Sequence, residues 1–300
     1  MPSSAHRLVN RGKYQKGEIV KISVHLKPHE TTVNERSSCL GRLLEARGYE
    51  VEWTTRDFVV PDTELTIQTC FAPSVALKWA IEQKVPFLIM EAPHFRSFYD
   101  KNVSASWGYN GLAGGAWRTA PPKEERPKPE LLPMKTEGKT LIIGQKPTDL
   151  SLRHTDHTQW ILDRFEEFPE ADFRPHPLMV WPRDMLPPIE EVLKDYKKVI
   201  TFNSLVGIDA TIAGCEVRVD GPCSLAPKEG VSREEWIHDL SWAQANYDDF
   251  DALVDNILDG YEEAKDRIQS GICEIARLRP DVQAIQQRYY REIPHAEWGV

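Results

Sequence analysis

The chain has 300 residues, of which 41% are hydrophobic and 28% charged, and its formal net charge is -9. This composition is typical of a soluble globular protein, and the length suits two domains of about 100 to 150 residues each. No stretch approaches the roughly 20 apolar residues that cross a bilayer, and the start lacks the apolar core of a secretory signal. We therefore expect a cytoplasmic protein without a membrane span. The negative charge repels a polyanion at long range, so a nucleic-acid partner would need a local basic patch.

The first third of the chain alternates strand and helix patterns. Apolar, β-branched runs predict strands, and segments with helical spacing between them predict helices. Strand, helix and strand in succession indicate a parallel sheet with right-handed crossovers. The predicted strands are 18–26, 49–54, 65–71 and 85–90, and the predicted helices are 38–47 and 74–83.

Two segments without periodicity follow. Residues 95–117 are rich in aromatic residues and glycine, which indicates a long functional or mobile loop. Residues 121–138 contain five prolines among many charges and predict a stiff, extended connector. We place the domain boundary in this connector, with an N-terminal lobe over 1–125, a C-terminal lobe over 126–260, and C-terminal helices over 261–300 for which a return to the N-terminal lobe is one option.

A second α/β run begins at residue 139. It predicts a parallel sheet of its own, in which the strands alternate with helices. Ser232 and Glu235 form a capping box that opens one of the helices. The predicted strands are 140–143, 172–174, 198–202 and 216–219, and the predicted helices are 157–168, 189–196, 205–213, 232–247, 250–261 and 262–279.

Polar segments follow three strands of this second run. Because ligands in open α/β folds settle at the carboxyl ends of the strands, these segments are candidates for an anion site. Cations, an imidazole and helix N-terminal amides at such ends suit a phosphate group, and a carboxylate further along the helix suits a ribose. The alternatives are ordinary ones: Ser204 or Asn203 as a helix cap, His176 as a structural loop residue, and 144–149 as a simple turn. The candidate donor-binding residues are Gly144, Gln145, Lys146, Arg174, His176, Asn203, Ser204 and Asp209.

The first lobe supplies candidates for general base and acceptor contacts. Glu91 and His94 directly follow an apolar strand, and either could take a proton from an acceptor hydroxyl. Asp149 in the second lobe, which could touch the donor sugar, completes the predicted catalytic set. The aromatic loop could stack on a base or sugar ring, or pack onto its own lobe. Its candidate acceptor-binding residues are Phe95, Arg96, Trp107 and Tyr109.

The standard phosphate-binding glycine motifs are absent. Neither Gly-x-x-x-x-Gly-Lys-Ser/Thr nor Gly-x-Gly-x-x-Gly occurs, so the P-loop and dinucleotide-binding classes lack their phosphate cradles.

The second-lobe motifs resemble a known family. The Gly144-Gln145 loop with Asp149, the Arg174-Pro-His-Pro segment and Asn203-Ser-x-x-Gly-Ile-Asp-Ala are similar to the capsule-polysaccharide-synthesis type of glycosyltransferase. They look most like its short phage-encoded members, some of which are thought to glycosylate modified DNA bases. The similarity covers roughly 139–247 and is looser in the first lobe.

The resemblance implies a GT-B fold, with two Rossmann-like lobes whose parallel sheets face each other across a cleft. It implies a nucleotide sugar on the C-terminal lobe, with His176 and Ser204 on its phosphates and Asp209 on its ribose. The family more often has Glu at the position of Asp209, and a different segment after Glu91.

We therefore predict a metal-independent glycosyltransferase that uses a nucleotide sugar, with a UDP-sugar favoured, and no cofactor. The favoured acceptor is a hydroxymethylated pyrimidine in phage DNA, inside the host cell, with phosphate contacts from a basic strip on the N-terminal lobe. The alternatives are a capsule-type saccharide transferase, a sugar-nucleotide epimerase and a non-catalytic protein that binds nucleotide sugars or nucleic acid. The basic strip comprises Arg7, Arg11, Lys13, Lys16 and Lys101.

Overall fold

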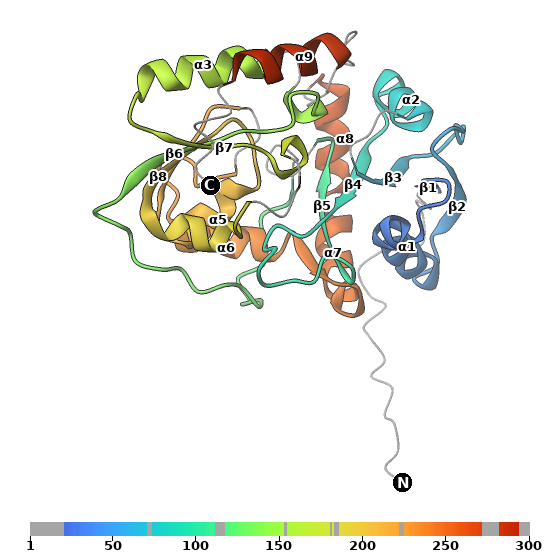
Figure 1. The fold of residues 1–300 in the computed structure, drawn as a ribbon. Helices are drawn as coiled ribbons and strands as arrows, with labels where there is room; N and C mark the ends of the chain where they lie inside the picture. Colours follow the sequence, from blue (N-terminus) through green and yellow to red (C-terminus); the bar gives the residue numbers. More distant parts are fainter. Residues whose placement is uncertain are drawn as a thin grey trace.

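The computed structural model describes residues 21–70, 74–111, 118–152, 155–180, 182, 186–221, 225–271 and 282–293. Within these residues the chain forms two α/β lobes, each built on its own sheet (Figure 1). Parallel pairs dominate both sheets. The predicted α/β class, with two lobes that each carry a largely parallel sheet, is confirmed.

The first lobe contains a six-stranded sheet with the order β10-β5-β4-β3-β1-β2. Strands β1 to β4 are parallel, whereas β5 runs antiparallel to both of its neighbours. Helices α1 (Thr31–Ala46) and α2 (Val75–Gln83) connect the parallel strands. The strands are β1 (Lys21–Leu26), β2 (Glu50–Thr55), β3 (Leu65–Thr69), β4 (Phe87–Glu91), β5 (Ser104–Tyr109) and β10 (Gln244–Asn246).

The second lobe contains a four-stranded sheet with the order β7-β6-β8-β9, and every pairing in it is parallel. The strands are β6 (Lys139–Ile143), β7 (Asp172–Arg174), β8 (Tyr196–Thr201) and β9 (Glu216–Val219). The helices between and after them are α3 (His157–Glu167), α4 (Ile189–Val192), α5 (Val206–Ile212) and α6 (Arg233–Ser241). Short 3₁₀ turns are η2 (Leu150–Leu152), η3 (Pro177–Met179), η5 (Leu193–Asp195) and, in the first lobe, η6 (Tyr247–Asp249).

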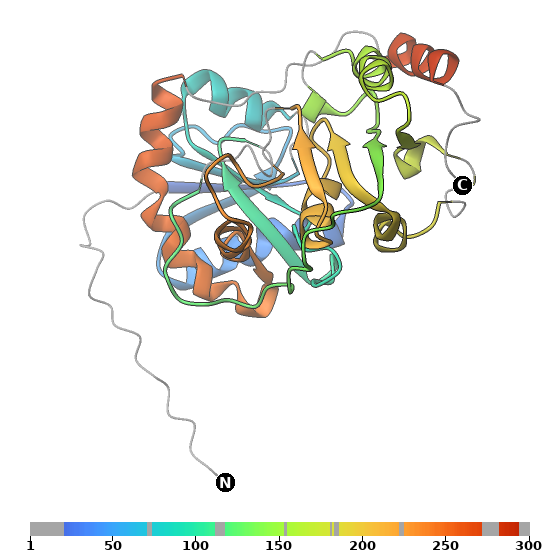
Figure 2. The same cartoon turned by 90° about the vertical axis from the view of Figure 1, so that its left-hand side faces the viewer.

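The C-terminal helices divide between the two lobes. Helices α7 (Asp251–Asp259) and α8 (Tyr261–Gln269) belong to the first lobe, where Leu253 and Ile257 lie in its main core. Helix α9 (Val282–Glu292) instead lies beside α3 of the second lobe in both views (Figures 1 and 2). Tyr289 of α9 is buried in the second-lobe core. The C-terminal part of the chain thus contributes helices to both lobes.

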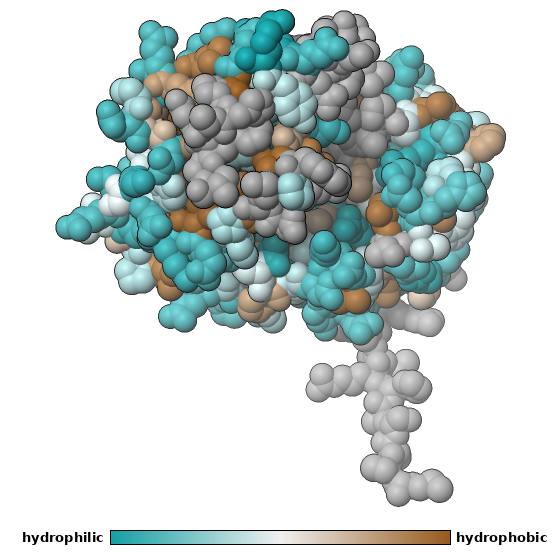
Figure 3. Space-filling view, in the orientation of Figure 1, coloured by the Kyte–Doolittle hydropathy of each residue, from teal (hydrophilic) through white to brown (hydrophobic). Residues whose placement is uncertain are grey.

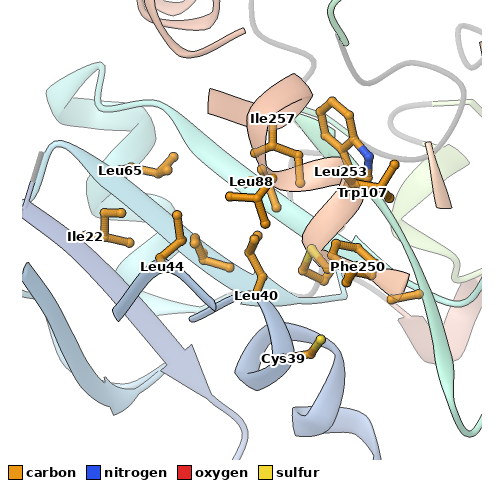
Figure 4. Packing of buried hydrophobic residues seen from close by; sticks show 14 of the residues in the cluster. Ile22, Cys39, Leu40, Leu44, Leu65, Leu88, Trp107, Phe250, Leu253 and Ile257 are labelled. Atoms are coloured by element: carbon orange, nitrogen blue, oxygen red, sulfur yellow. The ribbon is translucent and has the colours of Figure 1, made fainter. Parts of the chain in front are cut away.

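The main core of the first lobe lies between sheet A, by which we mean the six-stranded sheet, and helices α1 and α7 (Figure 4). Ile22, Leu65 and Leu88 project from neighbouring parallel strands, and Leu40 of α1 meets them with Leu253 of α7. Side chains of this size each contribute about 1.5 to 3 kcal/mol when fully buried. The burial of β4 from Phe87 to Met90 explains why this strand reads as a continuous apolar run rather than an alternating one.

Two strands of sheet A differ from the sequence prediction. The sequence indicates an unstructured loop over 104–109, because Ser-Ala-Ser-Trp-Gly-Tyr lacks a β-branched run. In the structure these residues form β5. Residues 244–246 form β10, although 232–247 is predicted as one helix; α6 ends at Ser241 and the chain then pairs with β5. The predicted C-terminal lobe over 126–260 therefore includes a strand and a helix that lie in the first lobe.

The connector over 121–138 contains no helix or strand, as predicted. It lies along the second lobe, where Leu132 N donates to Ile212 O and Lys135 N donates to Gly214 O. Hydrophilic residues cover most of the described surface on the face shown in Figure 3. Among the described residues, no helix combines the length and apolar character that a membrane crossing requires.

Candidate functional site

The candidate site lies at the carboxyl edge of the four-stranded sheet, which we call sheet B. Because β6 lies between β7 and β8, the loops that follow these three strands are neighbours in space. They carry Gln145 after β6, His176 after β7, and Asn203 and Ser204 after β8. The prediction that these segments meet at one edge of one sheet is therefore confirmed.

Gln145 and Asn203 hold two of these loops together. Gln145 Oε1 accepts a hydrogen bond from Asn203 N at 2.8 Å, and Gln145 Nε2 donates to Asn203 Oδ1 at 2.5 Å. Asn203 Nδ2 in turn donates to Ser151 O at 2.7 Å. Both amides are buried, so their hydrogen bonds are worth more than exposed ones would be. These side chains fix the loops at the sheet edge rather than reach out toward solvent.

The N-terminal amides of α5 are not the free donors that the sequence predicts. Ser204 Oγ accepts from Val206 N at 3.3 Å, while the amides of Gly207 and Ile208 donate to Ser204 O and Leu205 O. Ser204 N donates to the Thr201 hydroxyl at 3.0 Å. The alternative that Ser204 caps the helix therefore explains where the backbone N–H groups at the start of α5 donate. The Ser204 hydroxyl accepts from Val206 and keeps its own proton, which it can donate to a ligand.

His176 is oriented by its own backbone turn. Its Nδ1 accepts from Leu178 N at 3.1 Å, and it caps the η3 turn. The neutral ring therefore carries its proton on Nε2, which has no hydrogen-bond partner within the described residues. Burial lowers the pKa of His176, and the nearby positive charge of Lys146 and Arg96 lowers it further against an opposing effect of Asp149. The imidazole is thus neutral at neutral pH and presents one N–H donor.

Charged residues surround His176. Lys146, half-buried in the β6 loop, and Asp149, exposed in the same loop, both act on it electrostatically. Asp149 also stabilises its own loop, since its carboxylate accepts from Ser151 N at 2.8 Å. Arg174 points elsewhere: its Nη2 donates to Pro187 O at 2.6 Å. Of the predicted donor-side cations, Lys146 is the one that acts on His176.

Asp209 and Arg96 form an ion pair between the lobes. Arg96 follows β4 in the first lobe, and its Nη2 lies 2.5 Å from Asp209 Oδ2 on α5 of the second lobe. The Asp209 side chain is 6% exposed and that of Arg96 is 40% exposed. Burial raises the pKa of Asp209, whereas the Arg96 charge lowers it. The sequence assigns these two residues to the donor and the acceptor sides, and the structure brings them together.

The motif glycines have packing reasons. A Cβ on Gly144 would lie 2.7 Å from Phe173 Cζ, and one on Gly207 would lie 2.6 Å from Leu225 O. Both distances are shorter than real Cβ contacts. Gly144 therefore lets the β6 loop pass the β7 strand, and Gly207 lets α5 approach the segment at 225.

The carboxyl edge of sheet A lies on the first lobe. Glu91 ends β4 and is half-buried, and its charge helps to raise the pKa of Cys70 at the end of β3, behind the larger effect of burial. Cys70 has a φ of 62°, a left-handed conformation that is unusual for a residue with a side chain. Arg36 and Arg56 carry charges that act on the same thiol. Glu91 is thus the predicted base that remains partly accessible.

The structure contradicts four other first-lobe predictions. His94 is 1% exposed, and burial together with the Arg118 charge lowers its pKa to about 3, so no acceptor hydroxyl reaches it. Phe95, Trp107 and Tyr109 are also buried and cannot stack on an acceptor. Trp107 Nε1 donates to Trp242 O at 3.0 Å, and Tyr109 OH donates to Ile257 O at 2.9 Å. The alternative that these aromatics pack within the protein is the one observed.

Sequence reasoning missed two residues that build the sheet B edge. His157 Nε2 accepts from Gln145 N at 2.8 Å, and Thr201 Oγ1 accepts from Ser204 N. His157 opens α3 directly after its cap residue Asp156, which is a signal for a helix start rather than for a site. No pattern in the sequence pairs it with Gln145.

Part of the predicted basic strip, namely Arg7, Arg11, Lys13 and Lys16, lies outside the described residues. Lys101, its remaining member, is exposed on the first lobe.

Comparison with known proteins finds similarity in overall structure. No protein-family model matches the chain, and no curated protein matches its sequence. Two solved structures of KpsC from Thermosulfurimonas dismutans are similar to this chain. The beta Kdo 2,4 transferase is 14% identical, with a TM-score of 0.47 over 83% of this chain and 98% of that chain. The beta Kdo 2,7 transferase is 11% identical, with a TM-score of 0.49 over 79% of this chain and 99% of that chain.

Proposed function

We propose that this protein is a glycosyltransferase that moves a sugar from a nucleotide-sugar donor to an acceptor hydroxyl. The observation that carries the proposal is the orientation of His176. Its Nδ1 is occupied by Leu178 N, so its Nε2–H is the group available to a ligand. The charges of Asp149, Lys146 and the first-lobe Arg96 all act on this ring. A neutral N–H donor within electrostatic range of two cations suits a phosphate on which negative charge increases as the sugar departs.

The donor contacts follow from this edge. His176 Nε2 and the Ser204 hydroxyl would donate to the phosphates, and Lys146 would balance their charge. Asp209 would accept from ribose hydroxyls, as carboxylates do in other nucleotide sites. Gln145 and Asn203 are positioning residues in this proposal, because their amides are occupied by each other. We keep a UDP-sugar as the proposed donor and a metal-independent reaction.

Glu91 is the proposed base. It ends β4, five residues before Arg96, whose side chain reaches the second lobe. An acceptor bound on the first lobe near Glu91 would therefore face a donor on sheet B. Deprotonation by Glu91 would make the hydroxyl oxygen more nucleophilic as it attacks the anomeric carbon. The bond from that carbon to the phosphate oxygen breaks, and the nucleotide leaves with the electron pair.

For the acceptor we retain the sequence-based proposal of a hydroxymethylated pyrimidine in DNA, and a saccharide is the alternative. Neither the described first-lobe surface nor the net charge adds to the case for DNA. The identity of the acceptor is therefore decided by assay.

The test is a matrix of donors and acceptors. UDP-, CMP-, GDP- and dTDP-sugars are incubated with DNA containing hydroxymethylcytosine or hydroxymethyluracil and with a set of saccharides, and products are found by mass spectrometry. The proposal expects mass transfer of one sugar, retained when EDTA is present. Isomerised donor without any acceptor would indicate the epimerase instead. Stabilisation by nucleotide sugars with no product from any pair would indicate a binding protein.

A further inference from the structure

The Arg96–Asp209 ion pair places a first-lobe cation inside the second-lobe site. Arg96 lies in the loop after β4, but its guanidinium contacts a carboxylate on α5. The same charge is close enough to His176 to lower the pKa of the imidazole. Arg96 is therefore within electrostatic reach of both the proposed ribose ligand and the proposed phosphate ligand.

Asp209 depends on this cation. Its side chain is 6% exposed, and a buried carboxylate without a partner is costly. Among the described residues, Arg96 is the cationic group that pairs with it. Any ligand that draws Arg96 away must therefore supply new donors to Asp209.

The loop that carries Arg96 is fixed against the second lobe. Phe95 and Tyr99 on either side of it pack in one cluster with Ile208 of α5 and with Ile237 and Leu240 of α6. Phe95 N also donates to the side chain of Gln244 at 3.0 Å. With its backbone held at both sides, Arg96 can change partner by rotating its side chain, which is 40% exposed, without a movement of the lobes.

We propose that Arg96 is a ligand of the donor phosphate, contributed by the first lobe, and that Asp209 holds it while the donor is absent. This inference rests on the proposed function. When a nucleotide binds, its ribose hydroxyls donate to Asp209, and the released guanidinium turns to the phosphate beside His176. Both charges stay compensated throughout, because the carboxylate exchanges one donor for others and the guanidinium exchanges a carboxylate for a phosphate. Guanidinium groups bind phosphates in a planar, two-bond geometry that suits this role.

The exchange predicts opposite effects on the two parts of a nucleotide. Without Arg96, the phosphates lose a ligand but Asp209 becomes free for the ribose. Arg96→Ala should weaken UDP binding by about 10- to 100-fold, the range for a charge-assisted hydrogen bond. Uridine binding should stay equal or become tighter. Asp209→Asn should act in reverse, with tighter binding of inorganic pyrophosphate and weaker binding of uridine.

The experiment measures dissociation constants by calorimetry for UDP, uridine and pyrophosphate, with CMP and cytidine and with GDP and guanosine in parallel. Arg42→Ala is the matched control, since Arg42 forms an exposed ion pair with Glu35 far from sheet B and should leave every constant unchanged. If Arg96→Ala destabilises the fold, the double variant Arg96→Ala with Asp209→Asn, which leaves no charged carboxylate unpaired, is compared with Asp209→Asn alone. Between these two variants, the affinity for UDP and pyrophosphate should differ and the affinity for uridine should not.

The outcomes separate the two proposals. Equal loss of UDP and uridine affinity in Arg96→Ala, or unchanged UDP affinity, overturns the exchange while leaving the proposed function in place. If the wild-type protein binds none of the nucleotides, the proposed donor site is itself wrong and the exchange is wrong with it. A loss confined to the phosphate-bearing ligands supports both.

Discussion

The carboxyl edges of the two sheets differ in what covers them. In sheet B the loops after β6, β7 and β8 form the edge, and His176 and Lys146 there stay partly accessible. In sheet A the segment after β4 is covered, since β10 pairs with β5 and Phe95 packs against α5 and α6. His94 and Phe95 thereby become interior residues.

The difference teaches that a polar or aromatic residue at a strand end becomes a site only where no later element packs over it. The segments that cover the sheet A edge come from beyond residue 200, more than 100 positions along the chain. The predictions below test whether the two histidines, His176 and His94, differ in function as sharply as they differ in burial.

The largest effect is expected for His176→Ala. It removes the N–H donor proposed for the departing phosphate, and such groups contribute about 10²- to 10³-fold in rate. Turnover of the donor identified by the matrix assay should fall by that factor, while the thermal midpoint moves little because the side chain is half-buried at a loop. His176→Gln, which retains an N–H donor, should recover part of the rate. An alanine variant with wild-type turnover would remove His176 from the mechanism.

A smaller effect, on stability, is expected for Asn203→Ala. The substitution removes the partners of the buried Gln145 Nε2 and of Ser151 O, while the backbone N of residue 203 still donates to Gln145 Oε1. Each unsatisfied buried group costs about 1 to 3 kcal/mol. Urea unfolding should show a loss of about 3 kcal/mol, with weaker nucleotide binding as the two loops separate. Asn102→Ala is a suitable control, because that residue is exposed on the first lobe. Unchanged stability would mean that the Gln145–Asn203 contact does not hold the edge together.

Local patterns predicted most of the fold and part of the site. The predicted strands 140–143, 172–174 and 216–219 are close to the observed bounds. The first of them is a short apolar run that ends at Gly144. Strand β10 could not be predicted, since Gln-Ala-Asn has low β-propensity and forms a strand only because β5 offers an open edge. In the site, the sequence predicted that three loops meet, because the carboxyl ends of parallel strands lie at one edge. It could not predict the Arg96–Asp209 ion pair, because that contact depends on how the two lobes pack.

His94 should govern how stability depends on pH without affecting turnover at neutral pH. Its pKa is lowered from 6.5 to about 3 by burial, so the unfolded chain takes up a proton below pH 6.5 that the folded chain refuses. The contribution of the neutral His94 to the free energy of unfolding is fully present above pH 6.5 and is lost as the pH falls toward 3. Between pH 7.5 and 5.0 the loss amounts to about 2 kcal/mol. By urea unfolding, the free energy of unfolding should fall between pH 7.5 and 5.0 by about 2 kcal/mol more in the wild type than in His94→Phe.

The same variant tests the comparison at neutral pH. Both ring nitrogens of His94 lack a hydrogen-bond partner within the described residues, so an apolar ring in its place removes an unsatisfied polar group. His94→Phe should therefore be at least as stable as wild type at pH 7.5 and should retain donor turnover. A loss of turnover without a loss of stability would restore His94 to the catalytic set.

The smallest effect is expected for Trp107→Phe, which separates packing from acceptor binding at the aromatic segment. Phenylalanine keeps a ring within the core but has no N–H to donate to Trp242 O. The lost hydrogen bond is worth about 0.5 to 1.5 kcal/mol. The expected result is a small drop in the urea midpoint with an unchanged acceptor KM. If Trp107 instead stacked on the acceptor, the KM would rise while stability stayed constant, because the ring would then lie on the surface rather than between β5 and α7. A small drop in the urea midpoint at constant KM therefore assigns Trp107 to the core, and a raised KM at constant stability would assign it to the acceptor site.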